Sequence, residues 1–176
     1  MTCLVKFLDS AERLVVQVHP TIDFAKKYFN SKFGKTECWY FLSCADDAYV
    51  YLGFKEGIRK EDWISAVYNQ DIDKILSMLN RLPVKKGDCV FVEGGVPHAI
   101  GEGCFMAEVQ EPSDLMGVVE KKTPSGRELA DIKLHGGIGF ENMLKMFKYE
   151  GENLEQIKAK YTHAPKPIGE NVYEII

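Results

Sequence analysis

Leu14-Val15-Val16-Gln17-Val18-His19-Pro20 is the stretch of sequence that decides the fold of this chain. Its side chains alternate in a way that is typical of a β-strand with one buried face. Gln17 and His19 therefore point to the same side of the strand, about 6.6 Å apart along it. Proline has no N–H to donate, so Pro20 ends the strand. The stretch predicts a strand that presents a glutamine and a histidine to one interior.

Two later segments each add one potential metal ligand. Glu37 begins an apolar stretch at residues 37–42, and His98 follows another at residues 89–92 after a short corner. Three strands that direct side chains into one interior are typical of a small β-barrel. A catalytic zinc keeps one position open, whereas structural zinc sites fill all four and favour cysteine. Each residue alone is more often structural, but His19, Glu37 and His98 together predict a catalytic metal site.

The remaining patterns place these segments in a mainly β domain. We predict strands at residues 4–8, 13–19, 37–42, 48–52, 90–92, 104–110, 143–149 and 172–175. We predict helices at residues 24–29, 60–69 and 154–161, and a further helix that begins after a cap at Asp71. The helices around residues 60–80 lie between the second and third metal segments, so we interpret them as an insertion that covers the barrel. The pattern weakens from about residue 124, which indicates a C-terminal extension of a single domain spanning residues 1–176.

Composition and charge exclude several classes of protein. Hydrophobic residues make up 45% of the 176 positions and charged residues 27%, which is ordinary for a globular protein. The net charge of −4 argues against nucleic acid as a partner. No apolar run approaches the length of a membrane span, and no secretion leader is recognisable. Five cysteines without a Cys-x-x-Cys pair fit neither a disulfide framework nor a thiolate zinc site, so we expect a cytoplasmic location.

The motifs resemble those of the class I mannose-6-phosphate isomerase family, which has the cupin fold, a jelly-roll-like β-barrel. The resemblance covers the first two thirds of the chain in the correct order, and it is carried by residues 14–20, 34–40, 51–54, 83–88, 98–101 and 107–115. It implies one zinc ion held by Gln17, His19, Glu37 and His98. It also implies the interconversion of mannose 6-phosphate and fructose 6-phosphate.

The residues near these ligands suit that reaction. An aldose–ketose isomerase moves a proton between C1 and C2 through an enediol, and zinc can polarise the carbonyl group. Lys35 lies on the same strand face as Glu37 if the strand extends that far back, and a nearby dication could lower its pKa enough for it to act as a base. Asp114 stands at a position that the resemblance links to the active site. A solvated lysine and a capping aspartate are the structural alternatives, and the acid and the base stay unassigned.

The chain departs from that family at one position of the active site. Family members carry an arginine after the Asp114-Leu115 segment, whereas the corresponding residue here is Val118. Lys121, Lys122 and Arg127 could supply charge for a phosphate group, although such a run is more often a solvated surface. Two alternatives therefore stay open: a metal- or sugar-binding cupin that has lost turnover, and another cupin enzyme such as an iron-dependent oxygenase. Gln17 and its flanking motifs argue against the oxygenase. The same ligands accept zinc, iron or manganese.

Members of the family are also longer than this chain. A shortened barrel would expose an edge strand, which invites pairing with another chain, so we predict a possible homodimer. Histidine ligation further predicts that metal affinity falls below about pH 6, where free imidazole becomes protonated.

Overall fold

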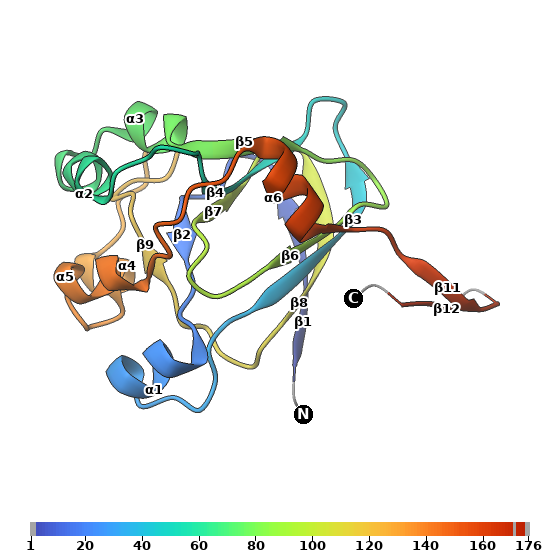
Figure 1. Cartoon of the computed structure of the whole chain (residues 1–176), viewed down its shortest axis with the longest axis horizontal. Helices are drawn as coiled ribbons and strands as arrows, with labels where there is room; N and C mark the ends of the chain where they lie inside the picture. The colour runs from blue at the N-terminus through green and yellow to red at the C-terminus, as the bar shows by residue number, and fades with distance from the viewer. Residues whose placement is uncertain (1–2, 171, 175–176) are drawn as a thin grey trace.

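The computed structural model describes residues 3–170 and 172–174 (Figure 1). Its strands are β1 (Leu4–Ser10), β2 (Gln17–Val18), β3 (Glu37–Cys44), β4 (Tyr49–Phe54), β5 (Leu79–Pro83), β6 (Cys89–Val92), β7 (His98–Ile100), β8 (Cys104–Gln110), β9 (Gly117–Val118), β10 (Thr162–His163), β11 (Lys166–Gly169) and β12 (Val172–Glu174). Its helices are α1 (Ile22–Phe29), α2 (Lys60–Asn69), α3 (Ile72–Ser77), α4 (Asp131–His135), α5 (Phe140–Met143), the 3₁₀-helix η1 (Leu144–Met146) and α6 (Leu154–Tyr161).

Two five-stranded antiparallel sheets form the body of the protein (Figure 1). Their strand orders are β1-β8-β3-β6-β10 and β5-β4-β7-β2-β9, so each sheet joins strands that are far apart in sequence. Side chains from both sheets meet in one buried cluster, which includes Trp39, Leu52, Val90 and Met106. Alternation places Met106 in this cluster while its neighbour Phe105 faces outward. The mainly β fold predicted from the sequence is confirmed.

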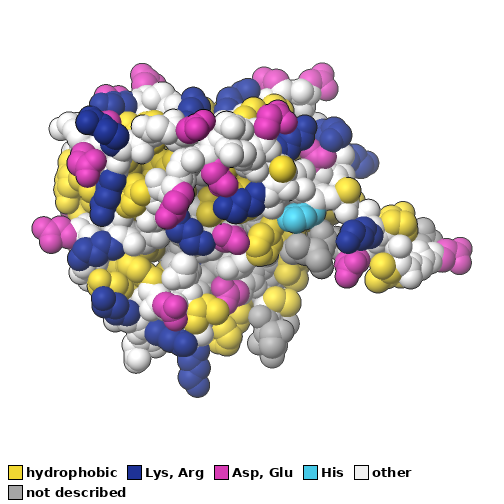
Figure 2. Space-filling view, in the orientation of Figure 1, with side chains coloured by type: hydrophobic (Ala, Val, Ile, Leu, Met, Phe, Trp, Pro, Cys, Tyr) yellow, Lys and Arg dark blue, Asp and Glu magenta, His cyan; other side chains and the backbone are white. Residues whose placement is uncertain are grey.

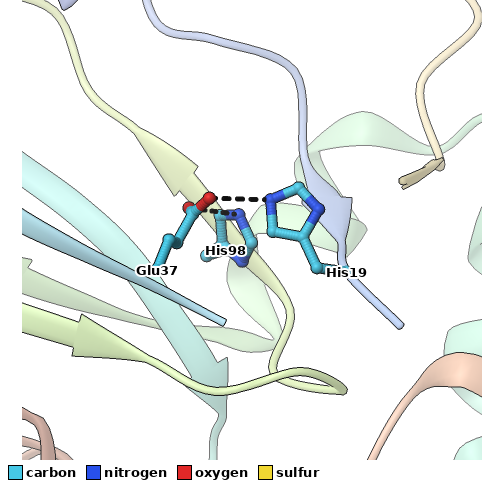
Figure 3. A group of neighbouring side chains, drawn as sticks. All are labelled: His19, Glu37 and His98. Atoms are coloured by element: carbon cyan, nitrogen blue, oxygen red, sulfur yellow. Dashed lines mark ion pairs between the residues drawn. The ribbon is translucent and has the colours of Figure 1, made fainter. Parts of the chain in front are cut away.

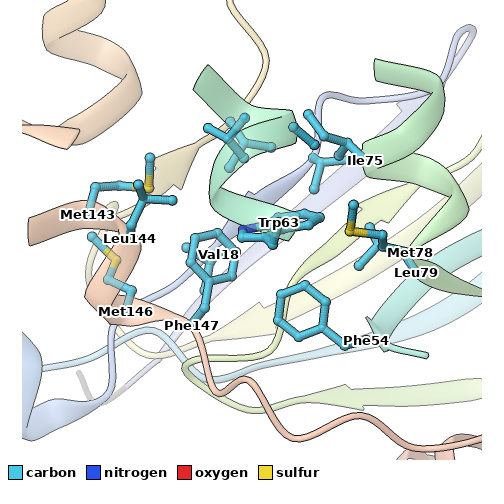
Figure 4. Close-up of a cluster of buried hydrophobic side chains, with 14 of the residues drawn as sticks. Val18, Phe54, Trp63, Ile75, Met78, Leu79, Met143, Leu144, Met146 and Phe147 are labelled. Atoms are coloured by element: carbon cyan, nitrogen blue, oxygen red, sulfur yellow. The ribbon is translucent and has the colours of Figure 1, made fainter. Parts of the chain in front are cut away.

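The helices α2 and α3 cover the outer face of the second sheet. Trp63 of α2 and Ile75 of α3 pack with Val18, Phe54 and Leu79 from that sheet in a second buried cluster (Figure 4). The bounds of α2 match the predicted helix at residues 60–69. Because the strand β2 alternates, its other face is left for the interior between the two sheets.

The segment at residues 143–149 is helical and irregular, so the strand predicted there is wrong. It contains the end of α5, the 3₁₀-helix η1 and a short extended stretch. Met143, Leu144, Met146 and Phe147 are all buried against the helical side of the second sheet. A short apolar run in which the two lysines, Lys145 and Lys148, are the exposed positions fits a strand and a helix about equally well, which explains the error.

The strand predicted at residues 13–19 forms a ladder only at Gln17–Val18. A buried carboxylate replaces the ladder upstream, because Glu120 accepts a hydrogen bond of 2.6 Å from the Val16 N–H. The same carboxylate binds Arg13 through two hydrogen bonds of 2.6 and 2.7 Å. This ion pair ties the segment before β2 to the segment after β9.

The C-terminal hairpin of β11 and β12 stands away from the body (Figures 1 and 2). The strand predicted at residues 172–175 agrees with β12 as far as Glu174, and residue 175 lies outside the described residues. Within the described part of the chain, no helix has the length and apolar character needed to cross a membrane.

Candidate metal centre

Three segments place His19, Glu37 and His98 in one buried group between the sheets (Figure 3). His19 directly follows β2, Glu37 is the first residue of β3, and His98 is the first residue of β7. Gln17 pairs with His98 in the ladder of β2 and β7, so the two histidines come from neighbouring strands. Strand ends that meet in this way bring together ligands that are about 80 residues apart in sequence.

Close packing around Pro20 holds the three segments in place. The Pro20 carbonyl accepts a hydrogen bond from the Lys35 N–H, and the His19 carbonyl accepts one from the Gly95 N–H. A Cβ atom at Gly34 or at Gly94 would lie 2.7 Å from the Pro20 carbonyl oxygen, which is too close for any side chain. Glycine is therefore needed where the chain leading to Glu37 and the corner before His98 touch this turn.

The ligand atoms of the group converge on one point. The Nε2 atom of His19 lies 3.1 Å from Oε2 of Glu37, and Nε2 of His98 lies 3.4 Å from Oε1. All three ligand atoms fall within 4.8 Å of one another, and the side chains have no exposed surface. Two nitrogens and one carboxylate at this separation match the donor set of a catalytic zinc site.

The hydrogen bonds of the two imidazole rings fix which nitrogen faces the centre. Nδ1 of His19 lies 3.0 Å from the Leu115 carbonyl oxygen, and Nδ1 of His98 lies 2.9 Å from the Val96 carbonyl oxygen. A carbonyl oxygen only accepts, so each Nδ1 carries the proton and each Nε2 presents a lone pair to the centre. Backbone acceptors behind histidine ligands have this orienting role in metal sites.

The charge states also suit a cation. Burial lowers the pKa of His98 to about 3 and also lowers the pKa of His19, so both rings are neutral at pH 7. Burial alone would raise the pKa of Glu37, but His19, His98 and Lys35 lower it below its ordinary value. Among the described residues, Oε2 of Glu37 and Nε2 of His98 have no hydrogen-bond partner. A buried anion and an unused lone pair side by side fit a bound cation.

Gln17, the fourth ligand implied by the family resemblance, lies beside this group. It is half-buried and stands opposite His98 on one side and opposite Val118 on the other. Residues directly opposite in a ladder share one face of the sheet, so Gln17 faces the same interior as His98. Val118, opposite Gln17 in the ladder, brings an apolar side chain to this face.

The two predicted catalytic residues have very different surroundings. Lys35 is buried, and its Nζ lies 3.0 Å from Nε2 of His19 and 3.2 Å from Oε2 of Glu37. It precedes β3 rather than extending it, so the loop at Pro20 places it in the site. The Asp114 side chain is 78% exposed and forms a 3.2 Å ion pair with Lys6.

Three site residues were missed from the sequence. Glu108 is buried on β8, and burial, together with the charge of Glu37, raises its pKa. Lys6 of β1 lies 3.7 Å from Glu108 and also contacts Asp114, so it links the surface to the interior. Trp39 donates a hydrogen bond of 3.0 Å to Glu37. Of these three residues, Glu108 had a signal in the sequence, because it is a polar residue at a position of β8 where the alternation of the strand directs side chains inward.

Comparison with known proteins agrees with this geometry. No family model matches the chain. The chain is 40% identical over 119 residues to the probable mannose-6-phosphate isomerase GmuF of Bacillus subtilis, covering 63% of this chain and 34% of that protein. It is 37% identical over 130 residues to the mannose-6-phosphate isomerase of Streptococcus mutans, covering 72% and 40%. The chain thus spans about a third to two fifths of the length of these relatives.

Solved structures give the same result. The mannose 6-phosphate isomerase of Bacillus subtilis superposes with a TM-score of 0.72 at 26% identity, over 87% of this chain and 46% of that one. A zinc-bound mannose 6-phosphate isomerase superposes with a TM-score of 0.65 at 15% identity, over 96% and 58%, which supports the fold alone. The resemblance stated from the motifs and the cupin fold are both confirmed.

Proposed function

We propose that this chain carries the metal centre of a zinc-dependent sugar-phosphate isomerase that interconverts mannose 6-phosphate and fructose 6-phosphate. One observation carries the proposal: two neutral histidines direct their Nε2 atoms at one buried carboxylate, and the three ligand atoms lie within 4.8 Å of one another. The similarity to relatives named mannose-6-phosphate isomerase, at 37–40% identity, supports the proposal.

Gln17, His19, Glu37 and His98 would hold one zinc ion. When bound, zinc supplies a positive charge that polarises a sugar carbonyl and stabilises the oxyanion that develops on it. The protein contributes a preformed set of ligands shielded from solvent, because the His19, Glu37 and His98 side chains have no exposed surface. The backbone carbonyls behind the histidines hold both rings in the ligating orientation.

Lys35 and Asp114 are the proposed catalytic residues. Lys35 reaches the ligand atoms from a buried position, which suits a base that removes the proton from the sugar carbon. Asp114 connects to the interior through Lys6, which also contacts Gln110 at 2.8 Å. Glu108 adds a buried carboxyl group next to Lys6, and burial together with the charge of Glu37 raises its pKa.

The first experiment assays zinc-loaded protein for fructose 6-phosphate formation from mannose 6-phosphate, with His19→Ala as the matched control. We expect turnover that this substitution abolishes together with zinc binding. A folded, zinc-containing protein without turnover would refute the isomerase and leave a metal- or sugar-binding cupin.

A second variant separates the proposed base from the metal site. Lys35→Met keeps a similar side-chain volume and removes the amine. It should retain zinc but lose the exchange of the carbon-bound substrate proton with deuterated solvent. Proton exchange at the wild-type rate in this variant would exclude Lys35 as the base.

We also propose that the chain is one cytoplasmic domain that self-associates. β1 is an outer strand of its sheet, and it exposes Val5 and Phe7 by 61% and 70%. An open apolar edge favours pairing with a second copy. Size-exclusion chromatography should show a dimer that Phe7→Lys weakens, and a wild-type monomer at all concentrations would contradict this.

A further inference from the structure

The indole of Trp39 contacts two of the three candidate ligands. Trp39 follows Glu37 by two residues on β3, so both side chains face the same interior. Its Nε1–H donates a hydrogen bond of 3.0 Å to Oε1 of Glu37. Its ring meets the ring of His98 edge-on, with centroids 5.4 Å apart and an angle of 67°. Trp39 has no exposed surface, so its position is fixed by the core around it.

This hydrogen bond makes the two carboxylate oxygens of Glu37 unequal. Oε1 accepts the indole N–H and lies 3.4 Å from Nε2 of His98, whereas Oε2 lies 3.1 Å from Nε2 of His19 and 3.2 Å from Nζ of Lys35. A carboxylate that is free to rotate can bind a metal through one oxygen or through both. The indole N–H limits that choice, because it occupies one lone pair of Oε1 and because a rotation of the carboxylate would break this buried hydrogen bond.

Trp39 also lies beside a second acidic side chain. Glu108 is buried and stands directly opposite Trp39 in the ladder of β3 and β8. Two carboxyl groups therefore approach the same indole, and its hydrogen bond to Oε1 favours a single orientation of the Glu37 side chain.

We propose that Trp39 is a positioning residue for the metal centre. It orients Glu37 so that Oε2 is the single metal-binding oxygen, and its ring packs against His98 and holds that ring in its ligating orientation. The proposal rests on the metal centre of the proposed function. Partners behind metal ligands are typically worth 10–100-fold in metal affinity, so loss of the indole N–H should weaken zinc binding by that factor.

Trp63→Phe provides a matched control for Trp39→Phe. The chain has two tryptophans, and both are fully buried. Trp63 lies in the cluster between α2 and the second sheet, and its Nε1 has no hydrogen-bond partner among the described residues. Each substitution keeps an aromatic ring and removes one indole N–H, but only the Trp39 substitution does so at the metal centre.

Zinc affinity is measured by competition with a chromophoric chelator, and ligand geometry by the visible absorption spectrum of the cobalt(II)-substituted protein. We expect Trp39→Phe to weaken zinc binding 10–100-fold and to change the cobalt bands, while Trp63→Phe leaves both as in the wild type. In Trp63→Phe, the remaining Trp39 emission should also change when zinc binds.

Three results would overturn the proposal. The first is wild-type zinc affinity and an unchanged cobalt spectrum in folded Trp39→Phe. The second is an equal loss of affinity in Trp63→Phe, which would show a general effect on folding. The third is a wild-type protein that binds neither metal, which would remove the metal centre itself and is recognised before any variant is compared.

Discussion

Acidification should destabilise the metal-free protein through the two buried histidines. Burial lowers the pKa of His98 to about 3 and lowers that of His19, whereas an imidazole in the unfolded chain has a pKa of about 6.5. The folded pKa lies below the unfolded value, so the unfolded state takes up protons first as the pH falls. Stability is therefore complete above about pH 6.5 and is lost progressively below it.

The expected loss is large compared with the stability of a typical domain. Between pH 7 and pH 5, a histidine that stays neutral in the fold, as a pKa of about 3 implies for His98, costs about 2 kcal/mol, and His19 adds to this loss. The free energy of unfolding of a typical domain is only about 5–15 kcal/mol. Glu37 does not contribute in this range, because its pKa is lowered in the fold and its own effect begins below about pH 4.5.

Urea denaturation in the presence of a chelator, at pH 7, 6 and 5, measures this loss. His98→Gln keeps a polar side chain but removes this titrating ring, so its loss of stability over the same range should be smaller than that of the wild type by about 2 kcal/mol. A wild-type free energy of unfolding that changes by less than about 1 kcal/mol from pH 7 to pH 5 would refute the argument from burial. Because the pKa values of both histidines are lowered, protons should compete with the metal for the histidine nitrogens at a lower pH than the value of about 6 expected from free imidazole.

Further predictions concern stability and metal binding. Glu120→Gln leaves Arg13 buried without its anionic partner and should cost about 3–5 kcal/mol in urea denaturation, whereas Glu128→Gln, at an exposed ion pair with Lys122, should cost about 1 kcal/mol or less. Asn153→Ala removes the capping box of α6 and should lower the free energy of unfolding by about 1 kcal/mol, seen as a lower Tm. Zinc at 100 times its Kd should raise the free energy of unfolding by ~2.7 kcal/mol, and no rise at all would contradict a native metal site.

The regular elements could be predicted where the sequence period is unambiguous. The bounds of α2, α6 and β8 match the predicted ones, and the helical spacing of Trp63, Ile64 and Val67 that predicts α2 depends only on neighbouring residues. The prediction of a strand at residues 143–149 failed because an apolar run without a clear period does not distinguish a strand from a helix. The cap at Asp71 was predicted correctly, since its side chain accepts a hydrogen bond from the Lys74 N–H.

The sequence alone determined the candidate metal ligands. Alternation placed Gln17 and His19 on one strand face, and residue chemistry singled out Glu37 and His98. The distances of 3.1 and 3.4 Å between their ligand atoms depend on the packing of two turns against Pro20 and on the pairing of β2 with β7. Such contacts join residues about 80 positions apart, and local patterns do not specify them.

Only the tertiary structure decided what surrounds those ligands. Lys6, Trp39 and Glu108 come to the site because β1, β8 and β3 are neighbours in one sheet, an order that crosses about 100 residues of sequence. Burial then sets the chemistry, because it keeps two histidines neutral and shields the Glu37 carboxylate from water. The sequence specifies the type of each residue, but the folded structure determines how polar its surroundings are and which residues it contacts.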